Sequence, residues 1–287
     1  MDPRILGAAF ALGLAPLAAV QAADAMAIGE ARPVAGLGSA DGVNAAMRWV
    51  ALGDGAHLAA LRIASPGAKA LRVGLRVGDI DPSAKLRFYA PEEVGGAAIP
   101  VARVMGTLAR NRASGESGPD ARTWWSPLVK GDTLVLEIEL PPGADPGALR
   151  LALPLVSHLR EWPQDANHAI AIATVNGATL ECPGALVAGR AGAARVSYLV
   201  TGSGCVATQS AASSLQAFWP HAASGVGARL LHASAQTGTA LVALDAPPAE
   251  AASFARPAAG GGDPSLEQWL GPAASRAIGA IDTFSSP

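Results

Sequence analysis

The sequence predicts a mainly β protein in which an N-terminal β-sandwich is followed by a second β-rich block. One observation is the high content of turn-forming residues, 33 glycines and 22 prolines in 287 residues, which argues against a helical bundle. A second is the series of short segments with alternating polarity, clearest at 71–77 and 134–140. Short strands of this kind, each closed by Gly, Pro or Asp, are typical of a sandwich.

The first 22 residues have the pattern of an export signal. Arg4 precedes an apolar run from Ile5 to Val20, which is too short to span a bilayer comfortably. The small side chains of Val20 and Ala22 fit signal-peptidase cleavage after Ala22. We therefore expect residues 1–22 to be removed and the protein to be periplasmic or extracellular. An uncleaved anchor is the alternative.

Residues 23–45 are small, polar and glycine-rich, and we expect them to form a linker. The sandwich domain is predicted over 46–160, and the break at 161–165 marks its end. The tryptophans at 124 and 125 are expected to pack in the core or at a sheet edge. Strands are predicted at 47–52, 57–63, 71–77, 86–89, 134–140 and 151–156.

The second block opens with a strand from His168 to Val175, and Asn176-Gly177 is the strongest hairpin signal in the chain. Residues 256–287 are expected to be a C-terminal tail with a short helix that begins at Asp263. Further strands are predicted at 178–182, 196–201 and 241–244, and a short helix within 207–217.

Composition excludes several function classes. The formal net charge is -2, and no basic stripe is present that would attract nucleic acid. No apolar run after the signal is long enough to span a membrane. The chain has only two cysteines, without histidines at zinc-finger spacing, and its glycine-rich segments lack the Lys-Ser/Thr of a phosphate loop. We therefore expect no metal and no cofactor.

Several segments of the second block resemble known proteases. Cys182–Val187 resembles a strand of trypsin-type serine proteases, and Tyr198–Cys205 resembles a segment of the secreted bacterial lysyl endopeptidase group. Pieces at 206–219, 228–234 and 246–249 continue in the same order, so the resemblance covers about residues 168–255. It implies that residues 166–255 form a single trypsin-like β-barrel half in which Cys182 and Cys205 are bridged. An oxidising compartment favours the same pairing.

The sandwich region also resembles a part of proteins in the same group. Segments at 70–75, 86–89, 125–127 and 131–138 are similar to the β-rich, propeptide-like module that precedes the protease in that group.

The resemblance also implies that the catalytic residues are lost. The general base would stand at position 204 and the carboxylate that orients it at position 238, where this chain has Gly204 and Gly238. The sequence contains no G-x-S-G-[GS] nucleophile motif, and too little of it follows residue 255 for a second barrel. His221 and His232 are interpreted as a loop residue and a strand-end residue.

Two hypotheses follow. The first is an exported, catalytically inactive serine-protease homologue that binds a protein, such as an active paralogue, its propeptide or the export machinery. The second is a diverged secreted serine endopeptidase of the trypsin-like, lysyl endopeptidase type, with a site that is rearranged or completed by a partner. Gly204 and Gly238 favour the first hypothesis. A drifting gene product without function is a third possibility.

Overall fold

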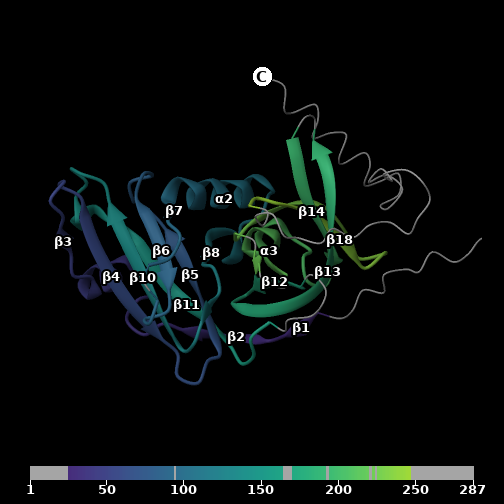
Figure 1. Ribbon diagram of the computed structural model, residues 1–287, viewed down its shortest axis with the longest axis horizontal. Helices are drawn as coiled ribbons and strands as arrows, with labels where there is room; N and C mark the ends of the chain where they lie inside the picture. The colour runs from purple at the N-terminus through teal and green to yellow at the C-terminus, as the bar shows by residue number, and fades with distance from the viewer. Residues whose placement is uncertain are drawn as a thin grey trace, which may run out of the picture.

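The computed structural model describes residues 25–93, 95–163, 170–191, 194–219, 222–223 and 225–246. Within these ranges the protein is mainly β, as predicted, and its strands form antiparallel sheets (Figure 1). The expected signal peptide, the C-terminal tail, His168 and His221 lie outside the described residues.

Two sheets form the sandwich of the first block. The first sheet has the strand order β3 (Val50–Ala51), β4 (His57–Ala64), β10 (Thr133–Leu140), β6 (Lys85–Tyr89) and β7 (Ile99–Pro100). The second, which we call the middle sheet, has the order β2 (Gly29–Pro33), β11 (Leu151–Leu159), β5 (Ala70–Val77) and β8 (Trp124–Trp125), and β9 (Val129–Lys130) also pairs with β5.

Strand β10 shows how the sequence pattern builds the sandwich. Leu134, Leu136 and Ile138 alternate along the strand and are fully buried in the core between the sheets. Glu137 and Glu139 lie on the opposite face, where they pair with basic residues of β6. Trp124 and Trp125 are both buried, as expected from their aromatic side chains.

Strand β5 departs from its sequence pattern. The alternation of apolar residues with Arg and Gly predicts one solvated face, yet six consecutive residues from Ala70 to Leu75 are buried. The reason is that the second block covers the outer face of the middle sheet, so β5 has protein on both sides.

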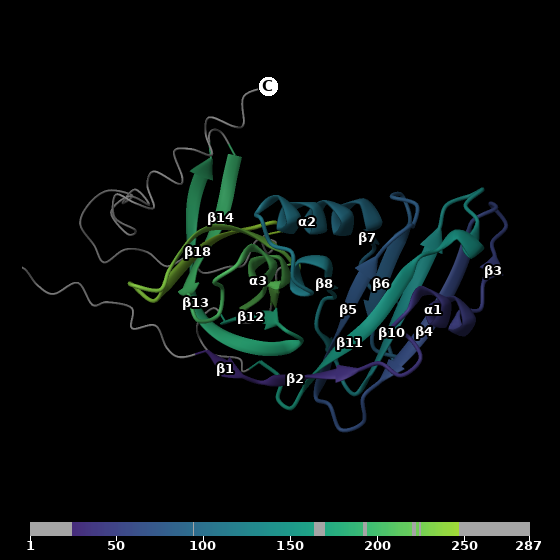
Figure 2. The same cartoon turned by 180° about the vertical axis from the view of Figure 1, so that it is seen from behind.

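Residues 25–45, the described part of the expected linker, lie largely in regular elements. They contain β1 (Met26–Ala27), β2 and all but the last residue of helix α1 (Ala40–Ala46). The strands form because β1 pairs with β13 (Ala178–Ala191) of the second block and β2 pairs with β11, so tertiary pairing overrides a weak local pattern. Figure 2 shows β1 and β2 running in sequence along one side of both blocks.

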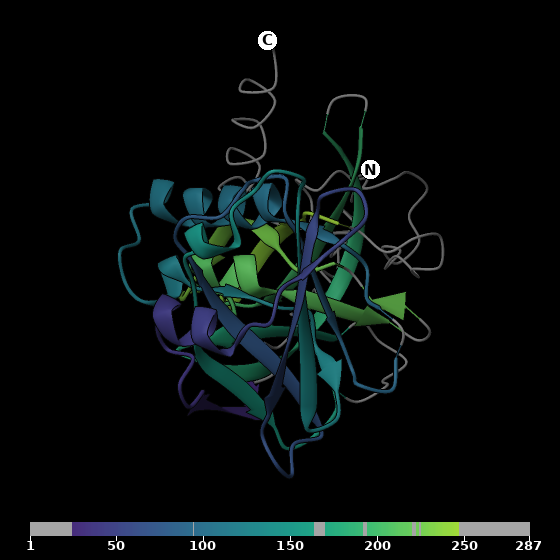
Figure 3. The ribbon, with the colours of Figure 1, turned by 90° about the vertical axis from the view of Figure 1, so that its left-hand side faces the viewer.

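Helix α2 (Val101–Ala113) was not expected. It lies above β7 and β8 and extends toward the second block (Figure 1). The first block also contains the short helices η1 (Asp120–Arg122) and η2 (Pro146–Ala148). Seen from the sandwich end in Figure 3, the strands of the first block lie in front of those of the second.

The second block is one sheet with the order β16-β15-β12-β13-β14-β18-β17. Its turn at Asn176 and Gly177 has φ values of 51° and 81°, which fit the predicted two-residue hairpin. The order β15-β12-β13-β14 is that of a Greek key. The remaining elements are β12 (Ile170–Val175), β14 (Ala194–Gly202), α3 (Gln209–Ser214), β15 (Gln216–Trp219), β16 (Ala222–Ala223), β17 (Ala228–Ser234) and β18 (Thr239–Leu244).

No strand ladder closes this sheet into a barrel within the described ranges. A side chain bridges the seam instead, because the amide of Gln209 donates to the Ala228 carbonyl (3.0 Å) and accepts from the Leu230 N–H (3.0 Å). The Gly227 N–H adds a bond to the Leu215 carbonyl (2.8 Å). The half-barrel expected from the resemblance is thus an open sheet whose two edges are joined by isolated hydrogen bonds.

Candidate functional site

Gly204 and Gly238, where the resemblance implies a base and its orienting carboxylate, lie near one another. Strands β14 and β18 are neighbours, with Gly202 opposite Thr239, so their ends at 204 and 238 meet at one edge of the sheet. The Ser203 N–H donates to the Gly238 carbonyl over 2.9 Å. We define the candidate site as the turn Gly202–Val206 together with Gly238.

A disulfide and backbone bonds fix this turn. The N–H groups of Cys205 and Val206 both donate to the Gly202 carbonyl, at 3.1 and 3.2 Å. Cys205 is joined to Cys182 of β13, and their Cα atoms lie 6.0 Å apart, within the usual range for a disulfide. Both cysteines are buried, so the turn is anchored to the core of the second block.

The site has room but lacks acid–base groups at its two key positions. A Cβ added at Gly204 would meet no atom within 4 Å, so the position is open. Gly238 has φ +67°, a conformation that favours glycine and is also adopted by Asn and Asp. Thr237 and Thr239 share a hydroxyl–hydroxyl bond of 2.7 Å near the site. A hydroxyl without an adjacent base is a weak nucleophile.

Other polar residues of the second block lie in contacts outside the candidate site. Asp245 forms a bidentate ion pair with Arg110 of α2, at 3.1 and 2.6 Å, and so joins the two blocks. The Ser210 hydroxyl donates to the Glu116 carboxylate of the first block. His232 lies on β17 opposite Leu241 of β18. It is two residues before Ser234, which pairs with Thr239 at the end of this strand pair.

A serine–histidine pair occurs in the first block, far from the glycines in sequence. The Ser65 hydroxyl and Nδ1 of His158 are 2.8 Å apart. Burial is the main cause that lowers the pKa of His158, and nearby Arg32 and Arg160 lower it further while Glu30 raises it. Ser65 is only 5% exposed and His158 only 4%, so a substrate could not reach them. We interpret the pair as a structural hydrogen bond.

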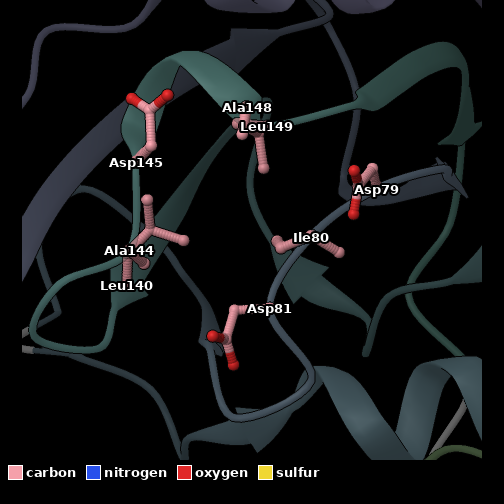
Figure 4. Close-up of a pocket in the computed structure, with 8 residues that line it drawn as sticks. All are labelled: Asp79, Ile80, Asp81, Leu140, Ala144, Asp145, Ala148 and Leu149. Atoms are coloured by element: carbon pink, nitrogen blue, oxygen red, sulfur yellow. The ribbon is translucent and has the colours of Figure 1, made fainter.

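A shallow pocket lies at one end of the sandwich, where Ile80, Leu149 and three aspartates line it (Figure 4). The carboxylates of Asp79, Asp81 and Asp145 stand around the hollow and do not converge on one point. Asp81 already accepts from the backbone and hydroxyl of Ser83, and Asp145 accepts from the Gly147 N–H. In the part of the chain that the structure describes, no group of His, Cys, Asp or Glu side chains could hold a metal ion.

Sequence reasoning missed two residues that contact the second block close to the site, Arg72 and Glu116. Their side chains bond to α3, which begins four residues after Cys205. No local signal marks either residue, because each acts on a segment that is remote in sequence. Across the described ranges, no helix is both long enough and apolar enough to cross a membrane.

Comparison with known proteins supports the family resemblance. Lysyl endopeptidase from Pseudomonas aeruginosa is 32% identical over 120 residues, a stretch that is 40% of this chain and 22% of that protein. This chain therefore matches only about a fifth of the length of that relative. No solved structure matches the chain. Residues 11–160, slightly more than half of the 287 residues, match the family model of the lysyl endopeptidase N-terminal domain, and the chain belongs to that family.

Proposed function

We propose that the protein is an exported serine-protease homologue without catalytic activity, and that it acts by binding another protein. The observation that carries the proposal is the pair Gly204 and Gly238. They stand at the positions that the resemblance gives to the base and its orienting carboxylate. The N–H of Ser203, the neighbour of Gly204 in sequence, donates to the Gly238 carbonyl over 2.9 Å, which supports treating the two positions as one site. Because glycine accepts no proton, no hydroxyl at this edge can be activated at neutral pH.

The binding partner is proposed from the family relationship. An active paralogue, its propeptide or the export machinery would each meet an exported lysyl endopeptidase homologue. The second candidate function is a diverged endopeptidase whose site is rearranged or is completed by another chain. The open space at Gly204 is the feature that favours it, because a partner's side chain could enter there.

The experiment that tests the proposal is labelling with a serine-directed fluorophosphonate probe, combined with a fluorogenic lysyl or arginyl peptide. We expect neither labelling nor turnover, while an active trypsin-type protease in the same assay gives both. Inactivity would be refuted if the probe labelled a serine in the folded protein but not in the denatured protein. Peptide turnover that follows the protein through purification would refute it as well.

A matched variant tests whether the two glycines alone explain inactivity. Gly204→His together with Gly238→Asp restores the residue types of a base and its carboxylate. A Cβ at 204 would meet no atom within 4 Å, and the φ of +67° at 238 is a conformation that Asp can adopt. We expect this variant to remain unlabelled, because the sequence has no G-x-S-G-[GS] motif to supply the nucleophile. Labelling only in the double variant would show that the chain carries its nucleophile elsewhere.

A further inference from the structure

Helix α3 lies between the candidate site and the first block. It spans only Gln209–Ser214, all six residues are buried, and it starts four residues after Cys205 of the site turn. A helix this short leaves most of its backbone N–H and C=O groups without partners inside the helix. In this protein the first block supplies partners at both of its ends.

At the N-terminal end the partner is Glu116, which follows α2. Its carboxylate accepts from the N–H groups of Gln209 (2.6 Å) and Ser210 (3.0 Å), and also from the Ser210 hydroxyl. The Ser114 hydroxyl donates to the same carboxylate over 3.0 Å and helps to orient it. Thr208 of the second block caps only one further N–H, that of Ala211 (3.1 Å).

At the C-terminal end the partner is Arg72 of β5. Its guanidinium donates to the Ser214 carbonyl (2.7 Å) and to the Thr174 hydroxyl of β12 (2.9 Å), while Nε donates to the Ser126 carbonyl of its own block (2.8 Å). Arg72 is fully buried, and all three of these acceptors are uncharged.

A third residue of the first block contacts the helix between its ends. The Asn111 side chain of α2 accepts from the Ser213 hydroxyl over 2.6 Å, and both residues are buried. Residues from β5, from α2 and from the segment after α2 therefore meet on one helix. Figure 1 shows α3 lying beneath α2 and next to β8, where these elements converge.

We propose that the first block is a clamp for α3, and that through α3 it adds to the disulfide and the backbone bonds in holding the turn Gly202–Val206 in place. The link is short, because three residues separate Cys205 from the helix and Thr208, the last of them, caps it. The first block thus controls the order of the candidate site without contributing a side chain to it. This role is independent of whether the site is catalytic.

The test compares Glu116→Ala with the control Glu139→Gln in the full-length protein. Glu139 is also an ion-paired carboxylate of the first block, but its partners Lys85 and Arg87 lie within the first sheet, away from α3. Two rates are measured under native conditions, amide hydrogen exchange by mass spectrometry and reduction of the Cys182–Cys205 disulfide by dithiothreitol.

We expect Glu116→Ala to raise exchange over residues 202–215 and disulfide reduction by about tenfold, the effect of losing hydrogen bonds to one charged group. Exchange in β10 should stay unchanged, and Glu139→Gln should change neither quantity at the site by more than about twofold. Glu116→Gln, which keeps the side-chain length, should give a smaller increase in the same segment.

Two outcomes would overturn the clamp. In the first, amide hydrogen exchange over residues 202–215 is no faster in either Glu116 variant than in Glu139→Gln. In the second, exchange rises equally in β10 and at the site, which would mean that Glu116 stabilises the fold as a whole. Neither readout depends on catalysis, so the result does not depend on whether the chain is a pseudoprotease.

Discussion

Substitutions of Arg72 separate the cost of a buried charge from the benefit of its hydrogen bonds. Burial lowers the pKa of Arg72 to about 9, and the shift corresponds to roughly 5 kcal/mol against the charged form. Its three hydrogen bonds involve a charged donor and contribute about 1.5–3 kcal/mol each, or about 5–9 kcal/mol together. The two contributions nearly cancel, so the native arginine adds only a few kcal/mol.

Two variants shift this balance differently. Arg72→Met removes both the buried charge and the bonds, and we expect the free energy of unfolding to fall by about 2 kcal/mol. Arg72→Lys keeps a buried charge. The planar guanidinium of Arg72 reaches acceptors on Ser126, Thr174 and Ser214 at once, but a single lysine ammonium cannot reach all three. We expect it to lose about 4 kcal/mol, so the conservative substitution is the more damaging one.

Urea unfolding followed by tryptophan fluorescence and by far-ultraviolet circular dichroism measures these free energies. Arg87→Lys is the matched control, because Arg87 pairs with Glu137 and Glu139 at a partly exposed site and should lose less than about 1 kcal/mol. A lysine variant as stable as the native protein would refute the reasoning. So would a methionine variant that is less stable than the lysine variant.

Three further predictions concern pH, the disulfide and the site. Because burial lowers the pKa of His158 in the folded protein, its contribution to stability is complete above about pH 6.5 and declines as the pH falls below that value. Thermal unfolding between pH 5 and 8 should show this decline, and His158→Gln should make the melting temperature less dependent on pH. Replacing Cys182 and Cys205 by alanine opens a loop with a sequence separation of 23 residues, which should lower the free energy of unfolding by about 3 kcal/mol; native protein that reduction does not destabilise would contradict this. Gly204→Ala should leave the melting temperature within about 2 °C of the native value, since nothing lies within 4 Å of the added methyl group, and a larger loss would mean that the turn is more crowded than the structure indicates.

The sequence predicts strands well where one face of the strand meets the core. Leu134 to Leu140 alternates because only one side of β10 faces the core, and Asn176-Gly177 specifies its turn through the backbone alone. Strand β2 has no such pattern, because pairing with β11 defines it rather than burial of one face. Helix α2 did carry a usable signal, since the buried Val101, Val104 and Leu108 are spaced by three and four residues.

The candidate site could be located from the sequence only through the family resemblance. Two glycines 34 positions apart carry no chemical pattern of their own, and their contact depends on the pairing of β14 with β18. The clamp residues are harder still to predict. Glu116 bonds a residue 94 positions away, and Arg72 bonds one 142 positions away. Contacts at such separations are set by how the blocks dock, which no local periodicity encodes.

The alternation of Arg72 and Gly74 with leucine and valine on β5 bears on how the two blocks are joined. That pattern suits an outer face exposed to water, yet the second block covers this face and takes its bonds from Arg72. Other side chains that hydrogen-bond across the two blocks include Asn111, Glu116 and the Arg110–Asp245 pair. Polar surfaces can be hydrated when they are exposed, whereas a continuous apolar core cannot. The docking surface also has an apolar part, where Ile172 of β12 packs with Ala70 and Leu159 of the middle sheet. A small apolar cluster surrounded by polar contacts resembles an interface between two proteins, and through such contacts the first block can hold α3 in place.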